Sequence, residues 1–76
     1  MARLPGINTE LAAAVRAINA AYNRLSPAAQ GRVEIAYDAM EAEVDAAILA
    51  GDRTRALAAI RAWRGHWLSE FERAGS

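Results

Sequence analysis

The chain has 76 residues, of which 54% are hydrophobic and 24% are charged, and its nine basic residues balance its nine acidic residues. This composition is typical of one small globular domain, and it gives no bulk electrostatic reason to bind nucleic acid or an anionic membrane. The chain has no Cys and one His, which excludes disulfides, thiol nucleophiles, Cys-ligated zinc and a two-His metal site within one chain.

The N-terminal segment carries one basic residue and no long apolar run, which does not fit a secretory signal peptide. The longest apolar runs in the chain have five residues, whereas a membrane-spanning helix needs about 20. We therefore expect a cytoplasmic protein that has no membrane partner.

The first predicted helix covers about residues 9–25. Its apolar residues recur at spacings of three and four, which places them on one face of a helix. Asn8 or Thr9 is expected to cap its N-terminus, because a short polar side chain accepts a hydrogen bond from the first free backbone N–H groups. Residues 1–8 are expected to form a short N-terminal arm.

The second predicted helix covers residues 27–50. Ser26 suits the N-cap position, and Pro27 suits the first helical position because no hydrogen-bond donor is needed there. Pro27 also disfavours helical geometry in Ser26, so the first helix is expected to end at this point. Gly31 is a weak point in the first turns of the second helix.

The third predicted helix covers residues 53–72, and residues 74–76 are expected to form a frayed tail. Gly51 can adopt the left-handed conformation that ends a helix, and Asp52 can cap the next one. Because both connections are short, neighbouring helices must run in opposite directions. The sequence therefore predicts a single all-α domain over residues 1–76, an antiparallel three-helix bundle (helices about 9–25, 27–50 and 53–72).

Four carboxylates of the second helix are predicted to share one side, because each residue advances about 100° around a helix. This acidic ridge comprises Glu34, Asp38, Glu41 and Asp45. The third helix is rich in arginine, so the neutral chain is electrically two-sided. Three interpretations stay open. The ridge forms a seam of intramolecular ion pairs, each worth less than about 1 kcal/mol, or it steers and docks a protein with a basic surface. In the third, the second helix of one chain meets the third helix of another copy in a homodimer.

Ile35 and Leu49 are predicted to lie on the back of the second helix, beside a strip of alanines. Small residues let another helix approach closely, so these two side chains are the predicted contact of a homodimer. The alternative is that they are singly exposed aliphatic side chains, which are common on small proteins.

On the third helix, Arg64 lies inside the predicted apolar arc, between Trp63 and Trp67. In one interpretation Arg64 extends to solvent along its aliphatic stem or pairs with a carboxylate. In the other, the three residues form an aromatic/Arg patch that contacts a partner, because Trp and Arg are the residues most enriched at interface hot spots.

No catalytic motif and no glycine-rich phosphate loop is present, so we expect no enzyme, no cofactor and no metal site. The predicted function is a small protein–protein interaction module, an adaptor, accessory subunit or inhibitor that docks through the acidic ridge and the aromatic/Arg patch. One alternative, by analogy only, is a phage or mobile-element inhibitor of a host nucleic-acid enzyme, anti-CRISPR-like in its role. The other is a DNA-binding regulator that uses the Arg-rich third helix, although its acidic neighbour disfavours nucleic acid as a partner.

Overall fold

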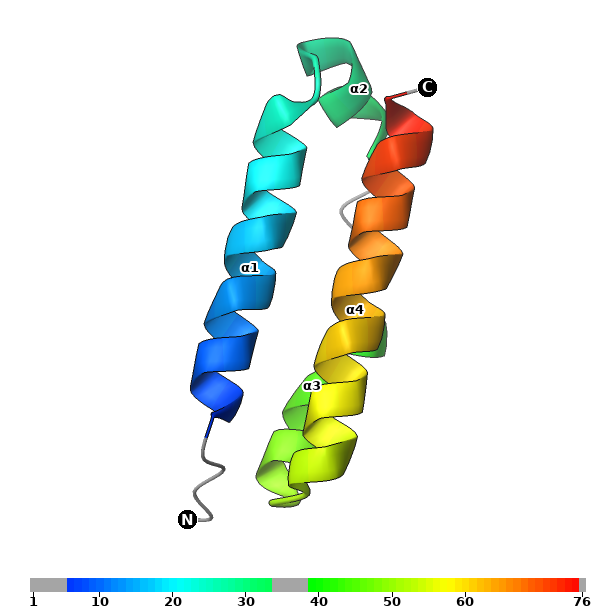
Figure 1. Cartoon of the computed structure of the whole chain (residues 1–76). Helices are drawn as coiled ribbons and strands as arrows, with labels where there is room; N and C mark the ends of the chain where they lie inside the picture. The colour runs from blue at the N-terminus through cyan, green and yellow to red at the C-terminus, as the bar shows by residue number, and fades with distance from the viewer. Residues whose placement is uncertain (1–5, 34–38, 76) are drawn as a thin grey trace.

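The computed structural model describes residues 6–33 and 39–75, and the regular structure within these ranges is entirely α-helical. Helices α1 (Ile7–Arg24), α2 (Pro27–Arg32), α3 (Ala39–Leu49) and α4 (Arg53–Ala74) follow one another in the chain. The predicted all-α fold is confirmed. Helices α1 and α4 run in the same direction, α3 runs in the opposite direction beside α4, and α2 lies across the end where α1 and α4 finish (Figure 1).

The local signals at the predicted turns are confirmed. The hydroxyl of Ser26 accepts a hydrogen bond of 3.1 Å from the backbone N–H of Ala29. The carboxylate of Asp52 accepts one of 3.0 Å from the N–H of Arg55. Gly51 adopts a φ of 71°, the left-handed conformation that only glycine adopts at little cost. These residues define where α2 and α4 begin.

The outer helices are longer than predicted. Helix α1 begins at Ile7, after Gly6 at a φ of 83°, and has no side-chain cap, so the capping role expected of Asn8 or Thr9 is wrong. Ile7 belongs to the helix rather than to an N-terminal arm, and it is only 1% exposed. Burial of this side chain favours the extra turn. Helix α4 continues to Ala74, so the tail is shorter than expected.

The prediction of one continuous helix over residues 27–50 is wrong. Helix α2 ends at Arg32, and Val33 has extended backbone angles (φ −79°, ψ 116°). Gly31 and the β-branched Val33 are both poor helix formers, which lowers the cost of this break. The next helix of the described residues is α3 (Ala39–Leu49).

Helix α2 supplies hydrogen bonds to the carboxyl ends of both long helices. Nε2 of Gln30 donates to the carbonyl of Tyr22 in α1 (3.0 Å). Nε and Nη2 of Arg32 donate to the carbonyl of Ala74 in α4 (3.1 and 2.6 Å). The last carbonyls of a helix lack partners within the helix, and a cation suits this negative end of the helix dipole. These bonds account for the position of α2 across the end of the molecule.

Helix α4 is the helix against which the others pack. The hydrophobic core joins α1, α3 and the first half of α4, and it consists of Ile7, Ala14, Val44, Ala47, Ala56, Ala59 and Ile60. Four of these seven residues are alanine, so the helix axes approach closely but each side chain buries little area. At a rise of about 1.5 Å per residue, α3 spans about 16 Å and α4 about 33 Å, so α3 covers only half of α4.

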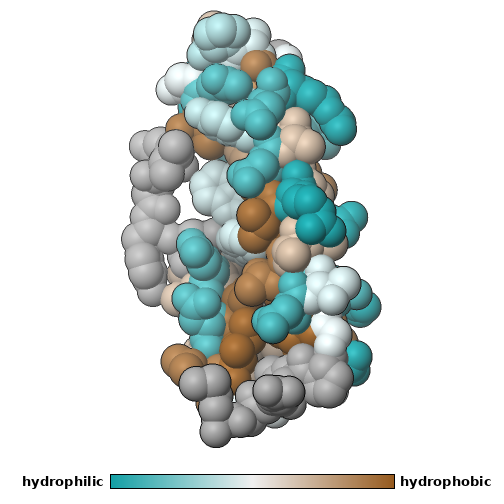
Figure 2. Space-filling view, turned by 90° about the vertical axis from the view of Figure 1, so that its left-hand side faces the viewer, coloured by the Kyte–Doolittle hydropathy of each residue, from teal (hydrophilic) through white to brown (hydrophobic). Residues whose placement is uncertain are grey.

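A second cluster of aromatic rings joins α1 to the half of α4 that α3 does not reach. The ring centroid of Phe71 lies 5.7 Å from that of Tyr22 and 5.7 Å from that of Trp67. Phe71 is buried, whereas Val15 on α1 is 39% exposed. Hydrophobic surface runs in a band along the α1 side of the molecule (Figure 2).

The molecule is elongated, with extents of 42 × 20 × 16 Å and a radius of gyration of 13.5 Å. A compact domain of this length has a radius of gyration of about 11 Å. A thin shape leaves more apolar surface in contact with water than a sphere does. The half of the molecule beyond α3 is therefore where uncovered apolar surface is expected.

Candidate protein-contact surface

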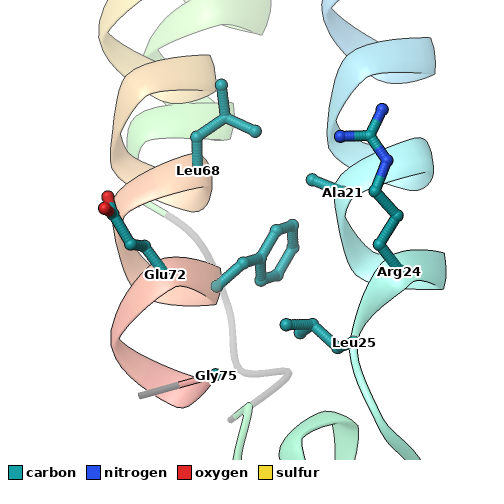
Figure 3. Close-up of a pocket in the computed structure, with 7 residues that line it drawn as sticks. Ala21, Arg24, Leu25, Leu68, Glu72 and Gly75 are labelled. Atoms are coloured by element: carbon teal, nitrogen blue, oxygen red, sulfur yellow. The ribbon is translucent and has the colours of Figure 1, made fainter.

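An open depression of about 410 Å³ lies between the carboxyl ends of α1 and α4. We call it the α1–α4 groove, and its lining residues are Ala21, Arg24, Leu25, Leu68, Phe71, Glu72 and Gly75. Ala21 and Leu25 extend from the α1 side toward α4, where Leu68 and Gly75 lie opposite them, and the carboxylate of Glu72 points away from α1 (Figure 3). The groove thus has an apolar interior with one cation and one anion at its rim.

Two features shape the carboxyl end of the groove. Helix α2 joins the two helices that form its walls, through hydrogen bonds to the carbonyls of Tyr22 and Ala74. Gly75 allows the end of α4 to approach Leu25, because a Cβ at this glycine would lie 3.3 Å from Leu25 Cδ2. A residue with a Cβ in place of Gly75 would require the end of the Leu25 side chain to shift by a few tenths of an ångström.

Two arginines extend the groove face along α4. Arg61 and Arg64 precede Leu68 by seven and four residues, which places all three on one face of the helix. Both arginines are exposed, and neither forms an ion pair or hydrogen bond with another residue of the described ranges. Arg24, on the other wall, is also exposed and unpaired within those ranges. The groove is therefore bordered by guanidinium groups that are available to a partner.

The predicted acidic ridge is only partly represented in the structure. Glu41 and Asp45 lie one turn apart on α3, and both are exposed. Glu34 and Asp38 lie outside the described residues, as does Ile35. The continuous helix that was predicted to carry all four carboxylates is interrupted after Arg32. The described structure therefore contains two of the four predicted ridge residues, Glu41 and Asp45.

An ion pair does join α3 to α4, but through a residue outside the predicted ridge. Arg55 Nε and Nη2 donate to the two carboxylate oxygens of Glu43 at 2.7 and 2.6 Å. The hydrogen bond from Arg55 lowers the pKa of Glu43 below its ordinary value. Glu41 and Asp45 form no such pair within the described part of the chain, so their charges remain free to act on a partner.

Leu49 ends α3 and is 88% exposed, as its predicted place on the back of the helix implies. Asp45 and Glu41 precede it by four and eight residues, so the three side chains lie along one strip of α3. This strip consists of one large apolar side chain and, before it in the sequence, two carboxylates. We call it the α3 strip.

The predicted aromatic/Arg patch is divided between two environments. Trp63 is partly buried against the core, and its Nε1–H is buried without a hydrogen-bond partner in the described structure. Trp67 is partly buried, with its ring 5.5 Å from that of His66. Arg64 is exposed on the groove face. Of the three predicted contact residues, Arg64 is therefore the one that a partner reaches most easily.

The groove itself was not predicted from the sequence, because helical periodicity identifies the apolar residues of each helix but not what packs against them. Within residues 6–33 and 39–75, no group of three or more His, Cys, Asp or Glu side chains is placed to hold a metal ion. The helices described here are also too short or too polar to cross a membrane. The chain shows no significant match to a protein-family model, a curated protein or a solved structure.

Proposed function

We propose that this protein acts by protein–protein contact, as an adaptor, accessory subunit or inhibitor, and that the α1–α4 groove is its main contact surface. The observation that carries the proposal is an open apolar depression whose borders hold exposed, unpaired arginines. An apolar centre with arginine at its edge is the composition of a binding hot spot. Sites for small molecules are more enclosed than this groove, because they bury most of the ligand surface.

The exposed carboxylates on α3 support a partner with a basic surface. Glu41 and Asp45 act at a distance by steering such a partner, which raises the rate of association more than it raises the final affinity. An inhibitor of a host nucleic-acid enzyme, anti-CRISPR-like in its role, is one form of this proposal, because enzymes that bind nucleic acid present basic surfaces. A homodimer contact at Ile35 and Leu49 is another form.

Site-specific photo-crosslinking tests the proposal. A photoreactive amino acid replaces Arg64 on the groove face or, as a control, Arg16 on α1. Arg16 is exposed and lies about 180° around the helix from the buried Ile7, so it faces away from α4. In cells of the native host, the Arg64 position is expected to form a covalent product with a second protein, identified by mass spectrometry, and the Arg16 position is not.

The purified partner then allows a direct measurement. Arg64→Glu is expected to weaken its binding at least about tenfold, because it removes the exposed guanidinium on the groove face and places the opposite charge there. Arg16→Glu makes the same charge change away from the groove and should leave binding unchanged. Equal crosslinking at the two positions, or equal binding by the two variants, would contradict a groove-based function.

DNA binding is the second candidate, favoured by the three unpaired arginines around the groove. Phosphate contacts make such binding strongly salt-dependent. A mobility shift of duplex DNA that disappears with added salt and with Arg61→Glu/Arg64→Glu would favour this candidate. We expect no shift, because Glu72 borders the same groove and the chain has no net charge.

A further inference from the structure

We propose that the α1–α4 groove receives the α3 strip of a second copy of this chain. The inference rests on the proposal that the protein acts by protein contact, and it adds a second copy of the chain as an occupant of the same groove. Each of the two surfaces has an apolar part. Leu49 is a large aliphatic side chain that is 88% exposed, and the groove between Leu25, Leu68 and Phe71 is an apolar depression that no helix of the described residues covers.

The charges on the two surfaces are opposite in sign and spaced alike. On the α3 strip, Asp45 lies about 6 Å and Glu41 about 12 Å along the helix from Leu49. On α4, Arg64 lies about 6 Å and Arg61 about 10.5 Å from Leu68. With Leu49 placed at the level of Leu68, each carboxylate therefore falls beside a guanidinium.

This register requires the incoming α3 to lie parallel to α4. In both helices the leucine follows the charged residues in sequence. When the two helices run parallel with their leucines at one level, each carboxylate of α3 therefore lies beside an arginine of α4. The small residues Ala42 and Ala46 lie beside the α3 strip, and Ala21 lines the groove. Small side chains on both sides allow the two helices to approach closely.

A chain cannot place its own α3 in its own groove. Its α3 packs on the side of α4 that carries Ala59 and Ala62, which line a depression together with residues of α3. Ala59 and Leu68 are nine residues apart and so lie about 180° apart around α4. The groove and the α3 strip are therefore on different sides of the molecule. Each copy can bind one neighbour through its groove and another neighbour through its α3 strip.

Contacts of this kind are heterologous, and they join copies head to tail. Eleven residues of one helix make an interface well below the standard size of about 1,600 Å², so the association is weak. We expect a monomer in dilute solution and a mass that increases steadily with protein concentration. Added salt should reduce the association, because the charged pairs lie at an exposed rim.

A charge-exchange experiment tests the inference on the full chain. One variant carries Arg61→Glu and Arg64→Glu, and the other carries Glu41→Arg and Asp45→Arg. Each variant alone brings like charges together, so each should need at least about tenfold more protein than the wild type to associate. In an equimolar mixture every contact between the two variants pairs opposite charges, and association is expected to return near the wild-type concentration.

Sedimentation velocity measures the mass, and far-UV circular dichroism shows that each variant keeps its helices. Leu49→Glu should also abolish association, whereas Arg16→Glu should not. A wild-type mass of 8.2 kDa at every concentration would overturn the inference, and so would a mixture that behaves as two separate monomers. Neither result would affect the crosslinking of a foreign partner, on which the proposed function depends.

Discussion

Glu43 and Arg55 are the residues through which charge joins α3 to α4. Both side chains are largely exposed, at 46% and 43%, so solvent screens the pair and its contribution to stability is small. The pair nevertheless aligns α3 with α4, because its two hydrogen bonds of 2.6 and 2.7 Å join one residue of each helix. The carboxylates that do not pair in this way, Glu41 and Asp45, remain exposed for contact with another molecule.

The pH dependence of this pair can be predicted. The hydrogen bond from Arg55 lowers the pKa of Glu43 in the folded protein, so the pair stabilises the fold above the ordinary carboxyl pKa. This stabilisation is lost as the pH falls through the lowered value. An NMR titration should show the Glu43 carboxyl titrating at lower pH in the wild type than in Arg55→Gln. The same titration curve in both proteins would mean that the ion pair does not form in solution.

At the scale of elements, the glycines of this chain have different roles. Gly51 must be glycine because its φ of 71° ends α3 and turns the chain into α4. Gly65 lies inside α4, and a Cβ built there meets nothing within 4 Å. Gly31 is equally unobstructed in α2, which suggests no packing reason for that glycine.

A matched pair of substitutions separates these roles. Gly65→Ala should stabilise the protein by about 1 kcal/mol, because alanine has the higher helix propensity and causes no clash. Gly51→Ala should destabilise it by about 1 kcal/mol, since alanine disfavours a positive φ. Urea unfolding monitored by circular dichroism measures both. A loss of stability in Gly65→Ala would show that a neighbour packs against that face of α4.

At the scale of the whole molecule, stability depends on a small, alanine-rich core at one end. A chain of this length is expected to have a folding stability of about 4–11 kcal/mol. Ile60 is 2% exposed at the centre of the core, and it is one of the few large side chains there. The other end depends on the aromatic cluster and on the hydrogen bonds of α2.

Substitution of Ile60 should therefore lower the folding stability far more than substitution of the exposed Leu49. Ile60→Ala is expected to cost about 2–5 kcal/mol, and Ile60→Val about 1 kcal/mol. Leu49→Ala should change the stability of the monomer by less than about 0.5 kcal/mol, because this side chain is 88% exposed. Denaturant midpoints of dilute protein measure all three. A large loss for Leu49→Ala would place that residue inside the fold rather than on a contact surface.

Several features followed from the amino-acid sequence itself. The helical fold, the start of α2 at Ser26-Pro27 and the turn at Gly51-Asp52 were all predicted correctly. Each depends on interactions between residues that are close in the chain, such as a cap three residues from the N–H group that it binds. Such interactions are present in any fold that contains the segment, so they can be predicted from the sequence without knowledge of tertiary contacts.

Only the tertiary structure decided where the middle helix breaks and which surface remains open. Arg32 binds the carbonyl of Ala74, 42 residues away, and this contact holds α2 across the ends of α1 and α4. The break leaves α3 too short to cover the second half of α4, so Leu68 lines a groove instead of a core. Helical periodicity can identify an apolar face, but it contains no information about the length of the helix that packs against that face.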